Sequence, residues 1–241
     1  MIKVEHVTKK FGADFKAVDD ISFTVEKGEI VGFVGQNGAG KTTTIKMMTG
    51  ILNPTAGTVT INGYDMKKKP LAAKQSIGYI ADNPDMFLRL TGLEFINLMA
   101  DIYGISEEER IKRIETLAES FEVKDALMRP MSDYSHGMRQ KMMVIAALVH
   151  NPPVWILDEP MTGLDPKAAF TLKKRMREHA EAGNCVFFST HVLEVAEQLC
   201  NRIIMVREGK AVFDGTLERL RDTYPDKTLE EIFLIVNGEM E

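Results

Sequence analysis

Apolar and polar residues alternate in the first part of the chain, in the segments IKVEHV, ISFTVEKG and GTVTINGYD. A period of two is typical of half-buried antiparallel strands, and the Asn-Gly pair of the third segment favours a tight turn. Between these segments, EIVGFV is almost continuously apolar, as expected of a buried strand. The pattern predicts an N-terminal part that is rich in β-structure.

The pattern changes to helical spacing between Thr91 and about Val149, over LEFINLMADIYG, SEEERIKRIETLAESF and GMRQKMMVIAALV. Apolar residues recur there as they do on one face of a helix. Ser106 precedes Glu109 by three residues, which is the spacing of a capping box at a helix start. We therefore predict a helical subdomain over about 88–150, inserted in one domain that spans 1–241.

Two nearly continuous apolar runs, VWIL and CVFFS, follow the helical part, and each precedes a helix-like segment. This order is typical of buried parallel strands in an α/β sheet. The closing segments predict a hairpin that turns at Glu208-Gly209 and a short helix within TLEEIFLIVNGEME. The expected fold class is therefore α/β.

Composition narrows the class of protein. The chain has 241 residues, of which 44% are hydrophobic, so one compound domain can bury a sizeable core. Its net charge of −5 opposes binding to a nucleic-acid backbone. The basic run Lys67–Lys69 is interpreted as a solvated turn, and no nucleic-acid partner is expected.

Cysteine usage and the apolar runs indicate the compartment. Cys185 and Cys200 lack the spacing of a metal or redox site, and the N-terminus carries no apolar signal region. Both features favour a reducing cytoplasm. The longest apolar run, MMVIAALV, is shorter than the ~20 residues that cross a bilayer. Any membrane span is therefore expected to belong to a partner.

The segment GQNGAGKTT follows the strand EIVGFV and matches the P-loop pattern at Gly35, Gly40, Lys41 and Thr42. The glycines allow backbone N–H groups to turn towards phosphates, the lysine reaches the terminal phosphates, and the hydroxyl can bind Mg²⁺. The lysine side chain is expected to point into an otherwise solvated site. A plain glycine-rich turn explains neither the lysine nor the threonine. The P-loop alone leaves kinases, GTPases and motor ATPases as alternatives.

An acidic pair ends the apolar strand VWIL, at the edge where ligands of open α/β sheets gather. Asp158 is suited to hold Mg²⁺ through water, and Glu159 is suited to act as a general base on an attacking water. The strand CVFFS ends in hydroxyls and then His191. This imidazole is placed to contact a γ-phosphate or to hold the water and Glu159 in register.

A second anion-binding surface is predicted at the helix start in DYSHGMRQKM, where Ser135 and the Gly137 N–H can bind an anion. The P-loop, however, already surrounds the phosphates of one nucleotide. At this segment the chain resembles the nucleotide-binding domain of ABC transporters. The resemblance covers essentially the whole chain, with YSHGM as the signature motif, GQNGAGKTT as Walker A, ILDEP as Walker B and TGLDP as the D-loop.

The resemblance implies a P-loop NTPase fold of ABC type, with a RecA-like mixed sheet, an N-terminal antiparallel β subdomain and an inserted α-helical subdomain. It implies ATP and Mg²⁺ as cofactors and ATP hydrolysis as the activity, with Glu159 and His191 as the catalytic residues. The implied metal ligands are Thr42, Asp82 and Asp158, and the implied ATP-binding residues are Phe11, which stacks on adenine, Gly35, Gln36, Asn37, Gly38, Ala39, Gly40, Lys41, Thr42, Thr43, Ser135, His136, Gly137 and Asp165.

The resemblance also implies two partners. In this family two copies pack head to tail, so the Ser135 helix start of one copy covers the ATP held by Lys41 of the other, and Asp165 crosses the interface. The second partner is an integral membrane permease that is gripped through the helical insertion and moved by the hydrolysis cycle. The implied location is cytoplasmic, peripheral on the inner face of the cell membrane.

Two positions depart from the family pattern. Where the family has a glutamine that touches Mg²⁺ and the attacking water, IGYIADNPDMF has Asp82, with Asn83 as the competing residue. The signature keeps Gly137 but has His136 in place of the first glycine of a pair. The form YSxGMxQ resembles ATPase subunits of bacterial export systems for drugs, peptides or bacteriocins, which implies export of a substrate that the sequence does not name.

Two other functions fit the sequence less well. A soluble ABC-type ATPase, acting as a nucleotide switch on a non-membrane partner such as the ribosome or DNA, usually has two such domains or a long coiled coil, which this sequence lacks. A kinase or GTPase is disfavoured because the guanine-specific NKxD pattern is missing and YSHGM is present. A neighbouring gene for a membrane protein would decide between a soluble factor and a transporter.

Overall fold

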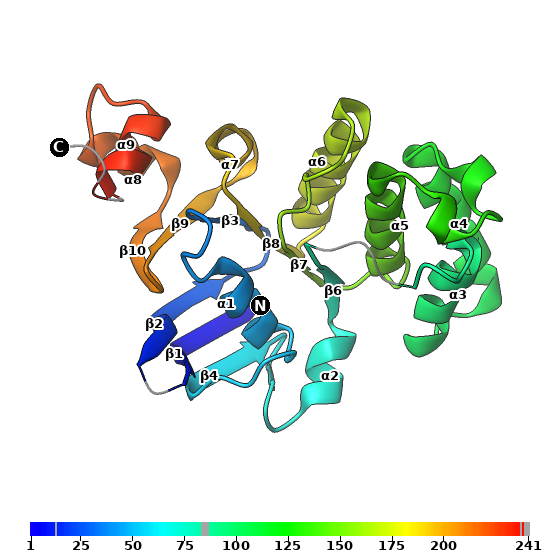
Figure 1. Cartoon of the computed structure of the whole chain (residues 1–241), viewed down its shortest axis with the longest axis horizontal. Coiled ribbons are helices and arrows are strands. Elements are labelled where there is room, and N and C mark those ends of the chain that lie inside the picture. The colour runs from blue at the N-terminus through cyan, green and yellow to red at the C-terminus, as the bar shows by residue number, and fades with distance from the viewer. Residues whose placement is uncertain (13, 83–86, 237, 239–241) are drawn as a thin grey trace.

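The computed structural model describes residues 1–12, 14–82, 87–236 and 238, arranged as two sheets with a layer of helices at one end (Figure 1). The strands are β1 Ile2–Phe11, β2 Phe15–Val25, β3 Ile30–Val34, β4 Ala56–Ile61, β5 Tyr64–Asp65, β6 Ile77–Ile80, β7 Val154–Leu157, β8 Cys185–Thr190, β9 Arg202–Arg207 and β10 Lys210–Gly215. The α-helices are α1 Lys41–Met48, α2 Pro70–Gln75, α3 Gly92–Ile102, α4 Glu107–Ser120, α5 His136–Leu148, α6 Pro166–Glu181, α7 Leu193–Leu199, α8 Leu217–Thr223 and α9 Leu229–Val236, and the 3-10 helices are η1 Lys124–Ala126 and η2 Met131–Asp133. The α/β class expected from the sequence is confirmed.

The larger sheet has six strands in the order β10-β9-β3-β8-β7-β6, and only the β9–β10 pair is antiparallel within the described residues. Every residue of β3, β7 and β8 is buried. The smaller sheet packs on one face of these strands and α6 on the other. Cover on both faces explains why these strands are apolar throughout.

The smaller sheet is antiparallel, in the order β2-β1-β4-β5. Along β1, Ile2 and Val4 are buried whereas Lys3 is exposed, so the alternation in the sequence separates the core face from the solvent face. Phe23 of β2 stacks on Phe187 of β8 with ring centroids 5.3 Å apart. The two sheets therefore share one core.

The helical layer, α3 to α5 with η1 and η2, lies between β6 and β7 in the chain and forms the right-hand part of Figure 1. Subdomain limits of about 88–150 stay a prediction. Over the described residues, none of the helices combines the length and the apolar character needed to span a membrane.

Helix starts in this layer differ from the expected capping. At α3, Thr91 and Glu94 form a reciprocal capping box. At α4, Ser106 accepts a bond from the Glu109 N–H at 3.4 Å, but the Glu109 carboxylate lies 3.2 Å from Nη2 of Arg113 instead of turning back to the cap. The full capping box predicted for Ser106 is therefore wrong, because the glutamate pairs with the arginine one turn along.

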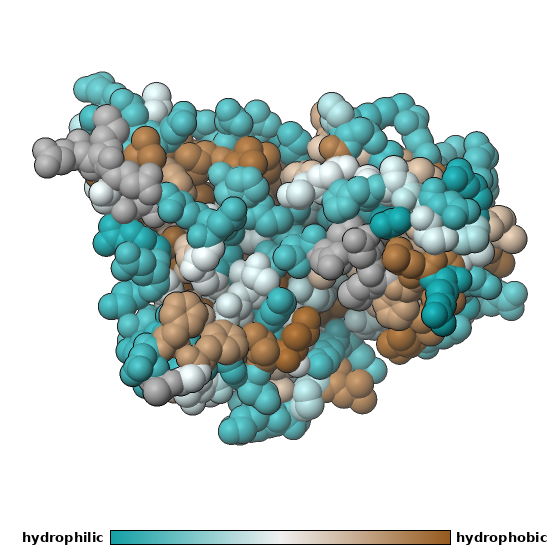
Figure 2. Space-filling model, viewed as in Figure 1, coloured by the Kyte–Doolittle hydropathy of each residue, from teal (hydrophilic) through white to brown (hydrophobic). Residues whose placement is uncertain are grey.

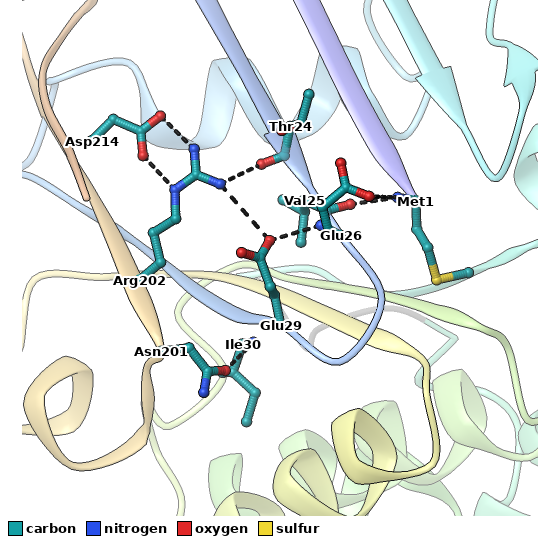
Figure 3. Close-up of polar contacts among 9 residues, drawn as sticks. All are labelled: Met1, Thr24, Val25, Glu26, Glu29, Ile30, Asn201, Arg202 and Asp214. Atoms are coloured by element: carbon teal, nitrogen blue, oxygen red, sulfur yellow. Dashed lines mark hydrogen bonds and ion pairs between the residues drawn. The ribbon is translucent and has the colours of Figure 1, made fainter. Parts of the chain in front are cut away.

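A polar network joins the two sheets at the amino ends of the parallel strands (Figure 3). Arg202, at the start of β9, donates from Nε and Nη2 to the two oxygens of Asp214 at 2.5 and 2.6 Å, and from Nη1 to the Thr24 carbonyl of β2 at 3.0 Å. The Asp214 carboxylate raises the pKa of the guanidinium. Because bidentate charged pairs are strong, this network fixes the edge opposite to the P-loop.

Candidate functional site

The carboxyl ends of three neighbouring strands bring predicted site residues together. β3 leads into the loop Gly35–Gly40, β7 ends directly before Asp158, and β8 ends directly before His191. Because β3 pairs with β8 and β8 with β7, all in parallel, these ends lie side by side. Open α/β sheets bind their ligands at this edge.

The loop Gly35–Gly40 depends on glycine for backbone shape and for space. Gly38 and Gly40 have φ values of +83° and +104°, in the region that favours glycine. A Cβ at Gly40 would lie 2.5 Å from the Ala17 carbonyl oxygen. Since α1 begins directly afterwards, its unpaired N–H groups and the positive end of its dipole favour a bound anion.

Lys41 lies inside the loop and not in solvent. Its side chain is 6% exposed, and Nζ donates to the carbonyl oxygens of Gly35 at 2.7 Å and Gln36 at 3.1 Å. The ammonium also lies 3.5 Å from Oε1 of Glu159. The side chain is therefore less exposed than a residue in a solvated site would be, because carbonyl oxygens of the loop surround the ammonium. Phosphate oxygens would replace contacts that protein oxygens now make.

Asp158 is fully buried, and its two oxygens differ in their contacts. Ser189 Oγ donates to Oδ1 at 2.6 Å. Burial raises the pKa of this carboxyl, and the charges of Asp82 and Glu159 add to the rise. In the described part of the chain, Oδ2 has no hydrogen-bond partner. Since an unpaired buried carboxylate oxygen is costly, a cation beside this oxygen fits the site.

The protein alone offers too few ligands for a complete metal site. No three His, Cys, Asp or Glu side chains are grouped for a metal among residues 1–12, 14–82, 87–236 and 238. Mg²⁺ commonly binds one or two carboxylates and takes further oxygens from substrate phosphates. Thr42 and Asp158 therefore fit a Mg²⁺–nucleotide complex. The alternative ligand Asn83 lies outside the described residues.

Glu159 is held by its backbone and by two neighbouring side chains. Its φ is +48°, which is uncommon for a residue with a side chain, and its N–H donates to Ser189 Oγ at 3.0 Å. Oε2 lies 3.0 Å from Nδ1 of His191, while Oε1 faces Lys41. The carboxylate is thus oriented between an imidazole and an ammonium.

A cavity of about 350 Å³ joins the P-loop, Asp82, Glu159 and two aromatic rings. Phe11 and Phe15 are register partners in the β1–β2 pair and are 44% and 63% exposed. Exposed aromatic rings beside a phosphate loop are suited to stack on a base. The lining residues are Phe11, Phe15, Ala17, Gln36, Asn37, Gly38, Gly40, Lys41, Thr42, Thr43, Asp82 and Glu159.

Six of the predicted nucleotide residues are not part of the cavity lining that the structure describes: Gly35 and Ala39, which belong to the P-loop, and Ser135, His136, Gly137 and Asp165, which do not. Ser135 caps α5 by accepting a bond from its backbone at 3.3 Å, and both Ser135 and His136 are exposed. Asp165 caps α6 and lies 2.7 Å from Nζ of Lys141. The bond from Lys141 lowers the pKa of this carboxyl. The predicted residues therefore form two separate groups.

The family model for "ABC transporter" matches residues 18–162. The chain belongs to the ABC transporter family. This ABC ATPase is 36% identical to the ABC transporter ATP-binding protein NatA of Bacillus subtilis (strain 168), over 91% of the chain and 89% of that protein. It is 34% identical to the Nod factor export ATP-binding protein I of Burkholderia lata, over 89% of the chain and 70% of that protein.

Two solved structures confirm the ABC-type fold. One, of the ATP-binding subunit of an ABC transporter, has a TM-score of 0.93 at 34% identity and covers 98% of this chain and 99% of its own. The other is a dimeric ATP-binding cassette in a post-hydrolysis state with ADP and Pi, with a TM-score of 0.81 at 26% identity, covering 90% and 99%. This ABC ATPase is therefore an ATP-binding, ATP-hydrolysing transporter subunit.

Besides Ala17, which also lines the cavity, Phe15 and Ser189 are absent from the set of site residues that the sequence predicts for this ABC ATPase. Phe15 lines the cavity together with Phe11. The sequence signal that could have identified it is the pairing of two aromatic residues across a hairpin. Ser189 contacts both Asp158 and the Glu159 N–H. Its signal is weaker, because a serine at a strand end is common and only the pairing of β7 with β8 brings it to the acids.

Proposed function

We propose that this ABC ATPase hydrolyses Mg²⁺-bound ATP in a site completed by a second copy, and that the cycle drives export through a separate membrane subunit. One observation carries the proposal. The chain has two surfaces suited to phosphate, but the P-loop lines the cavity whereas the Ser135 start of α5 lies apart from it. One nucleotide can use both surfaces only if they come from different copies.

The P-loop half supplies the chemistry of the proposed reaction. Its backbone N–H groups and Lys41 hold the phosphates, and Thr42 and Asp158 hold the metal. When bound, Mg²⁺ neutralises charge on the phosphate oxygens. Glu159 accepts a proton from the attacking water, and His191, 3.0 Å away, keeps that carboxylate aligned.

The α5 half supplies the covering surface. The first turn of α5 reads His-Gly-Met-Arg, whereas the first turn of α4 contains three glutamates. Acidic residues compensate the positive end of a helix, so the start of α5 keeps its attraction for a phosphate. The related cassette that contains ADP and Pi is a dimer, which supports a second copy as the partner.

The membrane subunit is proposed to bind in a groove of about 430 Å³ between the sheet and the helical layer. Ile51 and Phe87, which line it, are 54% and 45% exposed. Figure 2 shows hydrophobic side chains (brown) gathered beside α3. Exposed apolar patches of this kind mark contact sites. Asp82 lines both this groove and the nucleotide cavity, so it is placed to connect the two partners.

Export is the direction that the relatives support, because the Burkholderia lata relative is named as a Nod factor export protein. In this proposal the permease spans the cell membrane, and this chain binds it from the cytoplasm, at the inner face of that membrane. The cargo is decided by the permease pathway.

The test uses Glu159→Gln, which keeps the shape of the side chain but removes the base. ATPase activity is expected to fall by roughly 10²-fold or more, while gel filtration with ATP and Mg²⁺ shows a dimer. Lys41→Ala in the same background is the control, and it stays monomeric because the P-loop no longer holds ATP. A monomeric Glu159→Gln protein at saturating ATP would contradict the shared site.

A further inference from the structure

The start of α5 packs on the segment that follows Glu159 in the chain. That segment, Pro160–Asp165, runs from Glu159 to the start of α6. We call the contacts between α5 and Pro160–Asp165 the α5 seam. It includes His136, one of the two departures from the family pattern.

His136 packs against a glycine of this segment. Gly163 has φ +79°, and a Cβ there would lie 2.3 Å from Cδ2 and 2.7 Å from Nε2 of His136. The edge of the imidazole therefore occupies the space that a side chain at 163 would need. At the next residue, a Cβ on Gly137 would lie 2.7 Å from the Gly163 carbonyl oxygen. Two successive residues of α5 thus press on the backbone of Gly163.

Two further contacts extend the seam one turn along α5. Gln140, which is buried, donates from Nε2 to the Pro160 carbonyl at 3.4 Å. Lys141 Nζ lies 2.7 Å from Oδ2 of Asp165. Gln140 and Lys141 lie four residues after His136 and Gly137, and residues four apart share one face of a helix. This face of α5 therefore contacts both ends of Pro160–Asp165. A displacement of the α5 start carries the segment with it.

The segment is in turn tied to the proposed base. The Thr162 N–H donates to the Glu159 carbonyl at 3.0 Å, and the Leu164 N–H donates to the Met161 carbonyl at 3.2 Å. These bonds close two tight turns between Glu159 and Leu164. A shift at Gly163 therefore reaches Glu159 through a short and hydrogen-bonded stretch of backbone.

We propose that His136 is a positioning residue, which couples the nucleotide covered by its own α5 start to the placement of its own Glu159. The inference rests on the proposed shared site. A phosphate held by the other copy fixes Ser135 and Gly137. The His136 ring, seated on Gly163, passes that constraint to Pro160–Asp165. Each copy then aligns its base when its α5 start covers the ATP of the other copy.

Two substitutions of His136 distinguish the contribution of the ring as a whole from the contribution of its nitrogen atoms. His136→Gly removes the ring, and His136→Phe keeps a planar ring without nitrogen. The matched control is Glu107→Gly, because Glu107 also directly follows a serine cap, at the start of α4. The control therefore has a comparable cost in helix propensity without a contact to the seam. Circular dichroism and thermal unfolding confirm that each variant is folded.

His136→Gly is expected to lower kcat roughly tenfold, because a small misplacement of a reacting group is costly, and to lower the Hill coefficient for ATP. In the Glu159→Gln background, the ATP midpoint of dimer formation shifts less than about threefold, because Ser135 and Gly137 still bind phosphate. His136→Phe recovers most of the kcat that His136→Gly loses, and Glu107→Gly keeps kcat close to wild type. Unchanged kcat in His136→Gly would overturn the inference. A Phe variant as slow as the Gly variant would also overturn it, since the nitrogens would then act directly.

A double-mutant cycle with Gly163→Ala tests the pair independently. The added methyl collides with His136, so kcat falls, and adding His136→Gly removes the collision and restores part of kcat. Losses that simply add show that the two residues act separately, and the inference is then wrong. A wild type that lacks ATPase activity, or a Glu159→Gln protein that stays monomeric, contradicts the proposed function instead. The two failures are therefore distinguishable.

Discussion

The P-loop half and the α5 half of the nucleotide site are built in opposite ways. In the P-loop half, Lys41 is 6% exposed and Asp158 is fully buried, and carbonyl oxygens of the loop accept hydrogen bonds from the ammonium. In the α5 half, Ser135 and His136 are exposed. The first half is preorganised inside one chain, and the second is displayed on a surface. Such a division suits a nucleotide that is both the substrate and the contact between two copies.

The largest loss is expected from Lys41→Ala, which acts on the preorganised half. Without the ammonium, ATPase activity falls by roughly 10²–10³-fold, as on removal of one charge-stabilising donor. Calorimetric binding of ATP weakens as well. Thermal unfolding changes little, because water in the cavity can solvate the carbonyl oxygens of Gly35 and Gln36. An unchanged KM and kcat would show that the loop does not hold phosphate.

A smaller loss is expected at the aromatic end of the same half. Phe11→Ala raises KM for ATP roughly tenfold, because base stacking on an aromatic ring contributes ~1–3 kcal/mol, and kcat at saturation stays near wild type. Phe15→Ala is the comparison variant for the ring that the sequence did not single out. Steady-state kinetics measure both. Wild-type KM in the two single variants and in the double variant would remove the rings from the site.

Asp82 lies where the nucleotide cavity meets the groove, and its substitution is expected to change the apparent metal affinity by a few-fold. If its carboxylate helps to hold Mg²⁺, Asp82→Gln raises the Mg²⁺ concentration at half-maximal ATPase rate and leaves the rate at saturating metal largely intact. A parallel titration of Asn83→Ala is the control. A midpoint that moves only for Asn83→Ala would place the amide, and not Asp82, at the metal.

The smallest effect on activity is expected from substitution of His150 and His179, which help to hold the layers of the fold together. Burial lowers the pKa of His150 and His179 to about 4. His150 stacks on Tyr103 and contacts the Ile77 carbonyl of β6 at 3.1 Å, so it joins the helical layer to the sheet. Both imidazoles are neutral in the fold, whereas the unfolded chain protonates them near pH 6.5.

The sign of the pH effect follows from proton binding. Between about pH 6.5 and 4 the unfolded chain binds more protons, so these two groups make the free energy of unfolding fall with decreasing pH, by up to about 1.4 kcal/mol per unit for each histidine. Above pH 6.5 they add no slope. His150→Gln reduces the slope in chemical denaturation between pH 7 and 5, with little change in ATPase rate at pH 7. An unchanged slope would contradict the burial of this ring as the cause.

Much of the fold could be predicted because its signals are local. Continuous apolar runs mark β3, β7 and β8, and the Glu208-Gly209 turn of the last hairpin has positive φ at both residues. The capping box at Ser106 failed because Arg113 competes for the Glu109 carboxylate. A spacing pattern shows that a partner is within reach, but it does not show which partner a flexible carboxylate chooses.

The candidate site likewise has some residues that the local sequence reveals and others that only the tertiary structure reveals. The P-loop glycines lie within one short segment of the sequence, and the two acids after β7 lie within another. Each group can therefore be recognised from its local sequence. The roles of Phe15 and Ser189 depend on strand pairing, and the burial of Lys41 depends on how the loop closes. The packing of His136 on Gly163 joins residues of two different elements. No local pattern encodes such a contact.

A mixing experiment tests the shared site most directly. Lys41→Ala disables the P-loop half, and Ser135→Asp disables the α5 half by bringing a negative charge to the phosphate while keeping a good helix cap. Each variant alone is expected to be inactive. In an equal mixture, dimers that contain one chain of each kind have one site with both halves intact, so ATPase activity rises well above that of either variant, with about a quarter of wild type as the upper limit that random symmetric pairing would give. A mixture as inactive as either variant alone would contradict a site built from two copies.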